Sequence, residues 1–455
     1  MEFDRRRLLA ISAATTAAMP AAATLAQAAP AKMSALGIDA TQLGVFPGRP
    51  DDQTRALQRA IDQAAGARLP LALHPGVYRA GDLRLPGGAH IVGVRGATRL
   101  LLGQGASLVE AGNADSITLN GLTFDGAGRP LPSGRGLLHL AGVRGLRLLD
   151  CEITGAGRQG VVLEGVEGEV RGNTIAAAAQ TGLFSVNARG LVIAGNTVRG
   201  CGDNGIQVWR SDAGPDGTLV VGNRIEDIAA RSGGSGQNGN AINVFRAHGV
   251  FIGQNRINGA AFSAVRGNAA SDLQVIGNGI SGCGEVAIYA EFGFEGAVIS
   301  QNTINGAALG VVATNFNEGG RMAVVQGNII RRLAPKRPEG TDPNDSAGVG
   351  IGVEADTAVT GNVIEDAPTA GIMLGWGRHL RDVTVTGNVV RRAGVGVAVS
   401  VSAGAGAAVI ADNLIADVRS GAIVGMEQHR RVTGDLAREG AGRYAQLAIS
   451  GNRVR

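Results

Sequence analysis

The chain has 455 residues, of which 73 are glycine and only 3% are aromatic. Lysine and arginine together outnumber aspartate and glutamate by 42 to 38, and this small excess is scattered along the sequence, which argues against a nucleic-acid partner. Abundant glycine with modest charge also excludes a disordered tail and an ordinary helical enzyme. A repeated strand-and-turn unit is the expectation that remains.

The amino terminus has the pattern of an export signal. Arg5, Arg6 and Arg7 precede Leu8 and Leu9, an alanine-rich apolar stretch follows to Ala23, and Ala26-Gln27-Ala28 is the expected cleavage motif. Residues 1–28 are therefore predicted to be a signal peptide that resembles the twin-arginine type, although Asp4 stands where Ser or Thr is usual. Its removal leaves 39 basic residues (42 minus 3) against 36 acidic residues (38 minus 2).

This signal predicts export through the twin-arginine translocation machinery to a bacterial periplasm or the extracellular space. The apolar stretch is short for a membrane span, so no integral membrane segment is expected once the signal is removed. Ordinary secretion and an uncleaved anchor are the alternatives.

The next segments predict a linker and a cap. Residues 29–50 are expected to form a linker and a leading strand, and residues 51–105 a helix followed by the first strands. Apolar residues with helical spacing predict an amphipathic helix over 51–65, with Asp51 or Asp52 capping its first amides.

Two signals repeat after that point. A strand-like hexamer recurs from Gly205 to Arg378, starting at residues 205, 241, 261, 287, 310, 350 and 371, with apolar second and fourth positions. Side chains of a strand alternate faces, so the third and fifth positions should point away from the core. Asparagine recurs two residues before a Val or Ile, mostly at intervals of 23 to 27, at positions 173, 196, 223, 255, 278, 302, 328, 362, 388, 413 and 452.

The asparagine interval equals one coil of a three-sided β-helix, in which stacked asparagines form a hydrogen-bonded ladder. The helix at 51–65 and the motifs Pro75-Gly76-Val77-Tyr78, Leu85-Pro86-Gly87 and Ile91-Val92-Gly93 resemble the start of the pectate-lyase-like superfamily. The predicted fold is an all-β, single-stranded right-handed parallel β-helix over 106–455, with about 11 or 12 coils, an N-terminal capping helix and an irregular C-terminal cap at 428–446.

Residues 5–452 also resemble a family of twin-arginine-translocated repeat proteins of uncharacterised activity. The resemblance rests on the stretches 233–240, 291–296 and 315–321. It implies the fold and the compartment only.

Longer intervals in the repeat predict a groove. The insertions 232–240 and 335–345 leave the solenoid at one corner, and 211–218 and 316–322 leave it at the opposite edge of the hexamer strands. Loops on both sides would make this strand face a binding groove. Tolerated surface excursions are the alternative.

The outward hexamer positions supply the candidate binding residues. Sugar rings stack on flat aromatic side chains, and sugar hydroxyls bond planar donors and acceptors. Arg210, Arg246 and Arg266 are candidates to clamp the carboxylate or sulfate groups of an acidic polysaccharide. The full set of predicted substrate-binding residues is Trp209, Arg210, Asn243, Arg246, Arg266, Tyr289, Asn315, Asn317, Glu318, Arg321, Asp356, Trp376 and Arg378.

Glu291 and Glu354 are the candidate catalytic residues. They share the fifth hexamer position two coils apart, which is compatible with a general acid and a general base on either side of a water molecule. The alternative is that they form structural ion pairs with Arg266 or Arg321.

Metal and thiol chemistry have little support in the sequence. No histidine has zinc-ligand spacing, no calcium-binding aspartate cluster is apparent, and no cofactor is expected. His139 is expected to point inward, and Cys151, Cys201 and Cys283 are expected to be buried thiols of the core. The motifs of galacturonan hydrolases are each incomplete here.

The functional prediction is an exported β-helix protein that binds, and as a candidate enzyme cleaves or epimerises, an anionic polysaccharide in the groove. As an enzyme it would be a polysaccharide lyase, a glycoside hydrolase or an epimerase. The alternative is a non-catalytic envelope or surface protein that binds glycan or protein.

Overall fold

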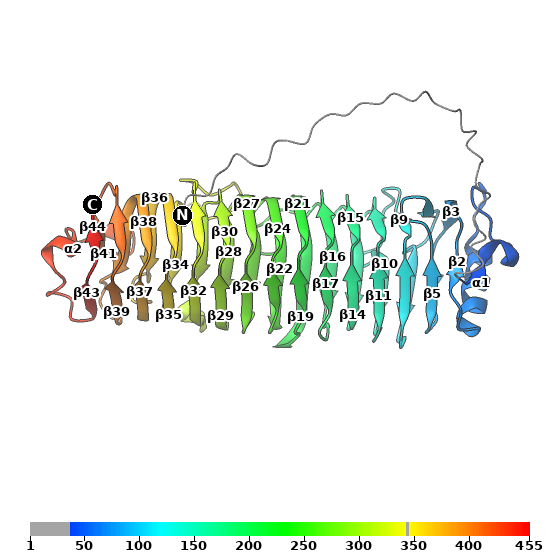
Figure 1. Ribbon diagram of the computed structural model, residues 1–455, viewed down its shortest axis with the longest axis horizontal. Coiled ribbons are helices and arrows are strands. Elements are labelled where there is room, and N and C mark those ends of the chain that lie inside the picture. Colours follow the sequence, from blue (N-terminus) through cyan, green and yellow to red (C-terminus); the bar gives the residue numbers. More distant parts are fainter. Residues whose placement is uncertain (1–36, 343–344) are drawn as a thin grey trace, which may run out of the picture.

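The computed structural model describes residues 37–342 and 345–455, which form one elongated parallel β-solenoid (Figure 1). Each complete coil contributes one strand to each of three faces, here named A, B and C. The predicted signal peptide, residues 1–28, lies outside the described residues.

Face A is a single sheet of 16 parallel strands. Its strands in order are β1 (Ile38–Asp39), β2 (Leu71–Ala72), β5 (Ala89–Val92), β8 (Ile117–Asn120), β11 (Leu146–Leu149), β14 (Gly168–Arg171), β17 (Val192–Ala194), β20 (Leu219–Val221), β23 (Phe251–Gly253), β26 (Leu273–Ile276), β29 (Glu295–Ser300), β32 (Arg321–Gln326), β35 (Ala355–Thr360), β37 (Arg381–Thr386), β39 (Ala408–Ala411) and β43 (Leu447–Ser450).

Face B follows face A in each coil. It contains β3 (Gly76–Ala80), β6 (Thr98–Leu102), β9 (Thr123–Asp125), β12 (Glu152–Thr154), β15 (Thr174–Ala176), β18 (Thr197–Arg199), β21 (Arg224–Ile228), β24 (Arg256–Ala260), β27 (Gly279–Cys283), β30 (Thr303–Asn305), β33 (Ile329–Arg331), the first parts of β36 (Val363–Leu374) and β38 (Val389–Ser400), β40 (Leu414–Ala416) and β44 (Arg453–Val454).

Face C carries the repeated hexamers. It contains β4 (Leu83–Arg84), β7 (Val109–Gly112), β10 (Gly136–Ala141), β13 (Gln159–Glu164), β16 (Thr181–Val186), β19 (Asn204–Pro215), β22 (Asn240–His248), β25 (Val265–Asn268), β28 (Val286–Glu291), β31 (Leu309–Ala313), β34 (Val349–Val353), the second parts of β36 and β38, and β41 (Ile423–Glu427), which forms a hairpin with β42 (Arg430–Arg431).

The asparagine ladder fixes the corner between faces A and B. Both the backbone N–H and the side-chain amide of Asn196 donate to Oδ1 of Asn223, at 2.9 and 3.0 Å, and the pattern continues to Asn452. Cys151 starts the ladder, since its N–H donates to Oδ1 of Asn173. Gly195 precedes Asn196 with φ of 63°, a left-handed conformation that glycine adopts without strain. The predicted ladder is therefore confirmed.

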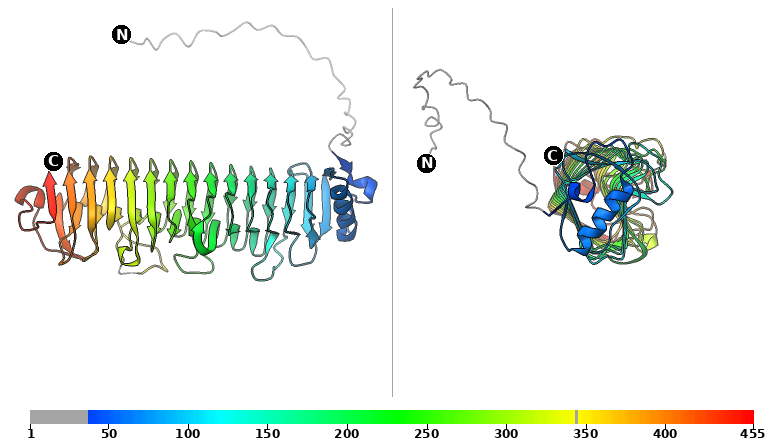
Figure 2. Two further views of the ribbon diagram at one scale, coloured as in Figure 1. Left: turned by 90° about the horizontal axis from the view of Figure 1, so that it is seen from below. Right: turned by 90° about the vertical axis from the view of Figure 1, so that its right-hand side faces the viewer.

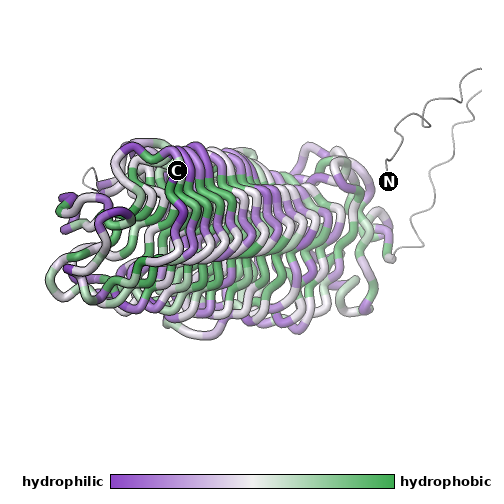
Figure 3. Tube along the Cα trace, turned by 60° about the vertical axis from the view of Figure 1, so that its left-hand side comes forward, coloured by the Kyte–Doolittle hydropathy of each residue, from purple (hydrophilic) through white to green (hydrophobic). Residues whose placement is uncertain are grey.

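The core fills the solenoid, and rows of residues with like hydropathy run along its long axis (Figure 3). The sixteen strands of face A exceed the 11 or 12 coils expected from the asparagines. The coils of β1, β2, β5 and β8 precede the first ladder residue, so they gave no asparagine signal. Cys151, Cys201 and Cys283 are buried free thiols, as predicted.

Helix α1 (Thr54–Gly66) lies across the N-terminal end of the solenoid (Figure 2). It buries Leu57 and Ile61 on the first coils, and Oδ1 of Asp52 accepts a hydrogen bond from the N–H of Thr54. This agrees with the predicted capping helix. No helix among residues 37–342 and 345–455 has the length and hydropathy of a membrane span.

The C-terminal end is covered by an irregular segment that includes helix α2 (Leu436–Glu439). The carboxylate of Asp435 accepts hydrogen bonds from the N–H groups of Ala422 and Ile423, at 3.0 and 3.1 Å. These amides lie at the last strand of face C. The segment thus satisfies part of a strand edge that would otherwise invite pairing with another chain.

Candidate functional site

Two loop systems border face C. The insertions at 232–240 and 335–345 both lie between a face B strand and a face C strand, namely between β21 and β22 and between β33 and β34. The extension of β19 to Pro215 and the 3-10 helix η3 (Phe316–Glu318) both lie on the opposite side, before the next face A strand. The predicted placement of the loops at opposite edges of this face is confirmed.

The strand register aligns several predicted residues on the outward side of face C. Asn243 lies beside Arg266, and Arg266 lies beside Tyr289, on three successive strands. The third hexamer, predicted at 261–266, starts at Ala264 in the strand alignment. Residues 261–263 form a bend before β25, and their alternating apolar residues imitated a strand. Arg266 therefore occupies the third hexamer position, not the sixth.

Trp209 belongs to an aromatic cluster away from the pocket described below. Its ring centroid lies 5.3 Å from that of Phe184 and 5.4 Å from that of Phe245, and its Nε1 donates to Oδ1 of Asn243 at 2.8 Å. Trp376 is on the same face but follows β36, six strands further along, or about 29 Å at ~4.8 Å a strand. The two tryptophans share a face and are not neighbours.

The three arginines do not form the expected anion clamp. Arg210 donates to the carbonyl oxygen of Asp212 at 3.3 Å, and Arg246 donates to the carbonyl oxygen of Ser211 at 3.1 Å. Arg266 is 8% exposed and is neutralised by two carboxylates. Arg266 is thus unavailable to an anion, whereas Arg210 and Arg246 each keep further N–H donors.

Glu291 is one of those carboxylates. Its two oxygens accept from Nε and Nη2 of Arg266 at 2.7 and 2.8 Å, and Asn268 donates to it at 3.0 Å. Only 2% of Glu291 is exposed. Of the two alternatives drawn from the sequence, the structure shows the ion pair with Arg266, and Glu291 does not line a pocket with Glu354.

The same ion-pair network anchors the second inserted loop. Glu285, which is buried, pairs with Arg266 at 3.3 Å and with Arg337 at 2.9 Å, and Arg337 also pairs with Asp345 at 3.1 Å. Burial raises the pKa of Glu285, and the two arginines act against that shift. Arg337 therefore fastens residues of the 335–345 insertion to the sheet.

A pocket of about 210 Å³ lies between this loop and face C, and we call it the loop pocket. Its apolar floor comes from β31, β34 and β36, and its rim comes from the loop and from the C-terminal cap. The lining residues are Tyr289, Leu309, Val312, Thr314, Arg337, Asp345, Ser346, Val349, Gly352, Val353, Glu354, Met373, Gly375, Trp376 and His429.

Glu354 is the carboxylate of the loop pocket whose environment is most altered. Its Oε2 accepts from the N–H of Phe316 at 2.7 Å. Burial raises the pKa of Glu354 above its ordinary value, and the backbone hydrogen bonds only partly oppose this. Such a carboxyl group holds its proton to higher pH and can donate it, as a general acid does.

Three rings border the loop pocket. The Trp376 and His429 centroids are 4.4 Å apart in an edge-on arrangement. Burial raises the pKa of Tyr289 to about 12, so its hydroxyl stays protonated at neutral pH and can donate a hydrogen bond. A pocket with aromatic walls and hydroxyl, amide or carboxyl groups suits a polyhydroxylated ring.

The other predicted residues form the edge beside the pocket. Oδ1 of Asn315 accepts from the N–H of Phe292, and the Asn317 amide donates to Glu318. Asp356 pairs with Arg381 and, at 3.5 Å, with Arg321. Arg378 lies in the turn after Trp376. These residues do not line the loop pocket.

Sequence reasoning missed two parts of the loop pocket and misplaced one histidine. Arg337 and His429 come from a loop and a cap, which have no periodic signal, although both insertions were recognised as departures from the period. His139 was expected to point inward, but its neighbours Leu138 and Leu140 fill the core and the register turns His139 outward. It lines a separate cleft at the N-terminal end. Among the described residues, no three His, Cys, Asp or Glu side chains gather as metal ligands.

Comparison with known proteins agrees with this architecture. The family model described as "right handed beta helix region" matches residues 104–225 and 213–390. The curated proteins contain no significant match.

Two solved structures show the fold. The pre-mature gene product 12 of bacteriophage phi29 superimposes with a TM-score of 0.52 at 12% identity, covering 86% of this chain and 55% of that one. The catalytic unit of a GH87 α-1,3-glucanase from Streptomyces thermodiastaticus strain HF3-3 superimposes with a TM-score of 0.50 at 16% identity, covering 94% of this chain and 70% of that one. This chain thus spans little more than half of the phage protein, and the likeness at such low identity is one of fold.

Proposed function

This chain belongs to the right-handed β-helix family, and on that fold we propose that it binds a carbohydrate in the loop pocket of face C. The observation that carries the proposal is Glu354, a carboxyl group with a raised pKa in a pocket walled by Tyr289, Trp376 and His429. Rings offer stacking surfaces for a pyranose, and the Glu354 carboxyl group can hydrogen-bond the hydroxyl groups of that ring.

The size of the loop pocket limits how much ligand enters it. Its volume of about 210 Å³ is below the ~300–1,000 Å³ typical of small-molecule sites. One sugar ring, at a chain end or a branch, is therefore the proposed occupant, and the rest of the chain would lie on the open part of face C.

The glycan need not be acidic. Arg266 and Arg337 are paired with buried or loop carboxylates, and Arg210 and Arg246 are bonded to backbone oxygens. Arg266 and Arg337 therefore give no support to the acidic preference expected from the sequence, and Arg210 and Arg246 do not line the loop pocket. Neutral and acidic glycans are both candidates for the loop pocket.

Catalysis is a second candidate function, and Glu354 is the observation that favours it. A raised pKa suits a general acid that protonates a leaving oxygen. The base would have to be a group other than Glu291, which Arg266 holds. If no base acts, the protein is a non-catalytic glycan-binding protein of the envelope or surface.

We further propose that the protein is exported by the twin-arginine route and works in the periplasm or outside the cell. The support is the arginine-rich start and apolar stretch of residues 1–28. Fusing these residues to a reporter that is active only after folded export tests the route, and substitution of Arg5, Arg6 and Arg7 by lysine should abolish export.

The binding and catalytic proposals share one experiment. The purified protein is incubated with a panel of neutral and uronic-acid glycans while binding, reducing ends and absorbance of unsaturated products are followed. Saturable binding that Glu354→Gln weakens supports the site, and product formation lost in the same variant adds catalysis. Absence of saturable binding across the panel would refute the carbohydrate proposal.

A further inference from the structure

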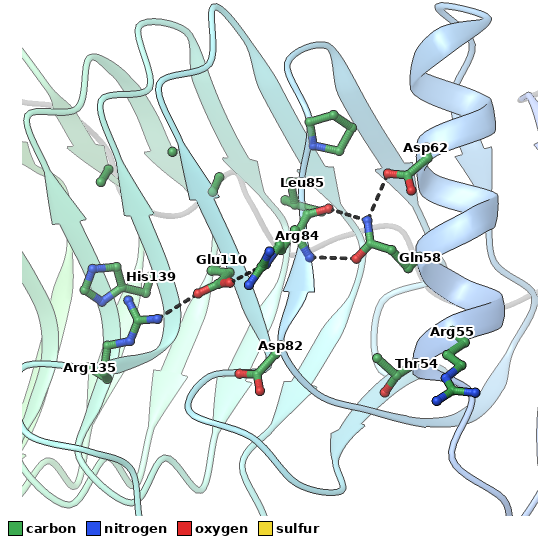
Figure 4. A pocket seen from close by; sticks show the side chains of 14 residues that line it. Thr54, Arg55, Gln58, Asp62, Asp82, Arg84, Leu85, Glu110, Arg135 and His139 are labelled. Atoms are coloured by element: carbon green, nitrogen blue, oxygen red, sulfur yellow. Dashed lines mark hydrogen bonds and ion pairs between the residues drawn. The ribbon is translucent and has the colours of Figure 1, made fainter.

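A second cleft lies at the N-terminal end of face C, between helix α1 and strands β4, β7 and β10 (Figure 4). Its volume of about 880 Å³ is within the ~300–1,000 Å³ of small-molecule sites. We call it the cap cleft. The row of His139 in this cleft lies six strands from the row of Tyr289, or about 29 Å at ~4.8 Å a strand, so it is separate from the loop pocket.

The cap cleft exists because its first coils carry small outward residues. Gly112 and Ala141 lie side by side in the outward row that continues through Glu164 and Val186 to Trp209. The later members fill the space above the sheet, whereas glycine and alanine leave it open beside α1. A flat floor of small residues admits a ring without a clash.

Arginine side chains converge on one carboxylate in this cleft. Glu110 accepts from Nε of Arg84 at 3.0 Å and from Nη2 of Arg135 at 2.7 Å, and Figure 4 shows it between them. Two guanidinium groups share one carboxylate, so this trio keeps one positive charge. The Arg84 side chain is 80% exposed, which leaves N–H donors toward solvent.

The acidic side chains near the trio have other partners. Oδ1 of Asp82 accepts from the N–H groups of Ala106 and Ser107, at 2.8 and 3.1 Å. Oδ1 of Asp62 accepts from Gln58 on the helix side of the cleft. The formal charges on the strand side balance, with Arg84 and Arg135 against Asp82 and Glu110, and the exposed Arg84 side chain keeps N–H donors toward solvent.

His139 forms part of the wall next to Arg135. Burial, and after it the charge of Arg135, hold the pKa of His139 below its ordinary value, so the imidazole is neutral at pH 7. Its Nε2 is 3.4 Å from Oε1 of Glu164, and its buried Nδ1 has no hydrogen-bond partner among the described residues. An anion placed beside Arg135 would offset the charge that depresses this pKa.

From this geometry we propose that the cap cleft binds a sugar acid, with its carboxylate on Arg84 and Arg135 and its ring over Gly112 and Ala141. Guanidinium groups recognise carboxylates through paired N–H donors. The cleft offers these donors at one end and a ring-sized floor beside them. This proposal does not depend on the function of the loop pocket.

The proposal is tested by isothermal titration calorimetry, in which glucuronate or galacturonate is added to the purified protein and the heat of binding is measured. One equivalent should bind saturably, glucose should bind about tenfold more weakly or worse, and Arg84→Gln or Arg135→Gln should weaken uronate binding by about tenfold or more. Arg256→Gln, on face B, is the matched control and should change the affinity less than about twofold.

A second readout separates recognition from a change of fold. The pKa of His139, followed by NMR, should rise when uronate binds and should not respond to glucose, since the bound carboxylate favours the imidazolium. Arg84 is mostly exposed, so its variant should fold normally. Equal affinity for glucose and uronate, full affinity in Arg84→Gln, or no saturable binding would each overturn the proposal, and Glu354→Gln should leave this binding intact.

Discussion

Arg266 holds both carboxylate oxygens of Glu291, at 2.7 and 2.8 Å, on neighbouring strands of face C. The pair is nearly excluded from solvent and also engages Glu285. Glu285 also pairs with Arg337, and this contact links the sheet to the inserted loop at 335–345. The sequence predicts Glu291 to be catalytic and Arg266 to bind substrate. In the structure the two form a buried ion pair next to the loop pocket.

Loss of Arg266 should therefore destabilise the solenoid strongly. Arg266→Ala leaves the buried carboxylate of Glu291 without its cationic partner and leaves Glu285 with Arg337 alone, so the free energy of unfolding should fall by about 3–5 kcal/mol. Urea denaturation followed by circular dichroism measures this. The double variant Arg266→Leu with Glu291→Leu should recover a large part of the loss, because a buried apolar pair carries no unpaired charge. A loss below about 1 kcal/mol in Arg266→Ala would mean the pair is a weak surface contact.

The asparagine ladder should be similarly sensitive. Asn255→Ala removes the acceptor for the backbone N–H and for one side-chain N–H of Asn223, so the free energy of unfolding should fall by about 2–6 kcal/mol, at about 1–3 kcal/mol for each of the two buried donors left unpaired. Asn317→Ala is the control, since its amide bonds only the adjacent Glu318 in an exposed turn, and should change stability by less than about 0.5 kcal/mol. Similar effects in both variants would show that the ladder carries no special weight.

Glu354 should make stability depend on pH. Because burial raises its pKa in the folded state, the folded protein binds this proton more tightly than the unfolded chain does. The stabilising contribution is full below the unfolded pKa, near about 4.3, and is lost as pH rises through the folded pKa. Glu354→Gln has no such proton, so its stability relative to the parent protein should increase as pH rises above about 4. A difference that stays constant as pH rises from there would contradict the raised pKa of Glu354.

Periodic features could be predicted from the sequence, and contacts between non-periodic segments could not. The asparagines and the apolar hexamer positions repeat because every coil meets the same packing and hydrogen-bonding demand, which identified the fold, the capping helix and the loop-bordered face. The bend at 261–263 imitated a strand and shifted the frame of Arg266. Only the neighbouring strands show whether such an alternation is paired.

The candidate sites depend on segments that leave the repeat. His429 reaches the loop pocket from the C-terminal cap, and the cap cleft needs α1 as its second wall. The sequence also did not determine which arginine pairs with Glu291, since Arg266 and Arg321 were both possible partners. Such pairing decides whether a carboxylate is free to react, and the sequence does not show which arginine is the partner.

The central claim is that carbohydrate binds the loop pocket, and the most direct measurement compares the affinities of Trp376→Ala and Trp209→Ala for the best glycan of the panel. Trp376 lines the pocket, so its loss should weaken binding by about tenfold or more, a cost of about 1.4 kcal/mol. Trp209 lies about 29 Å along the face at ~4.8 Å a strand, and its variant should bind within about twofold of the parent protein. Equal affinity in the parent and Trp376→Ala, or a larger loss in Trp209→Ala, would contradict the claim.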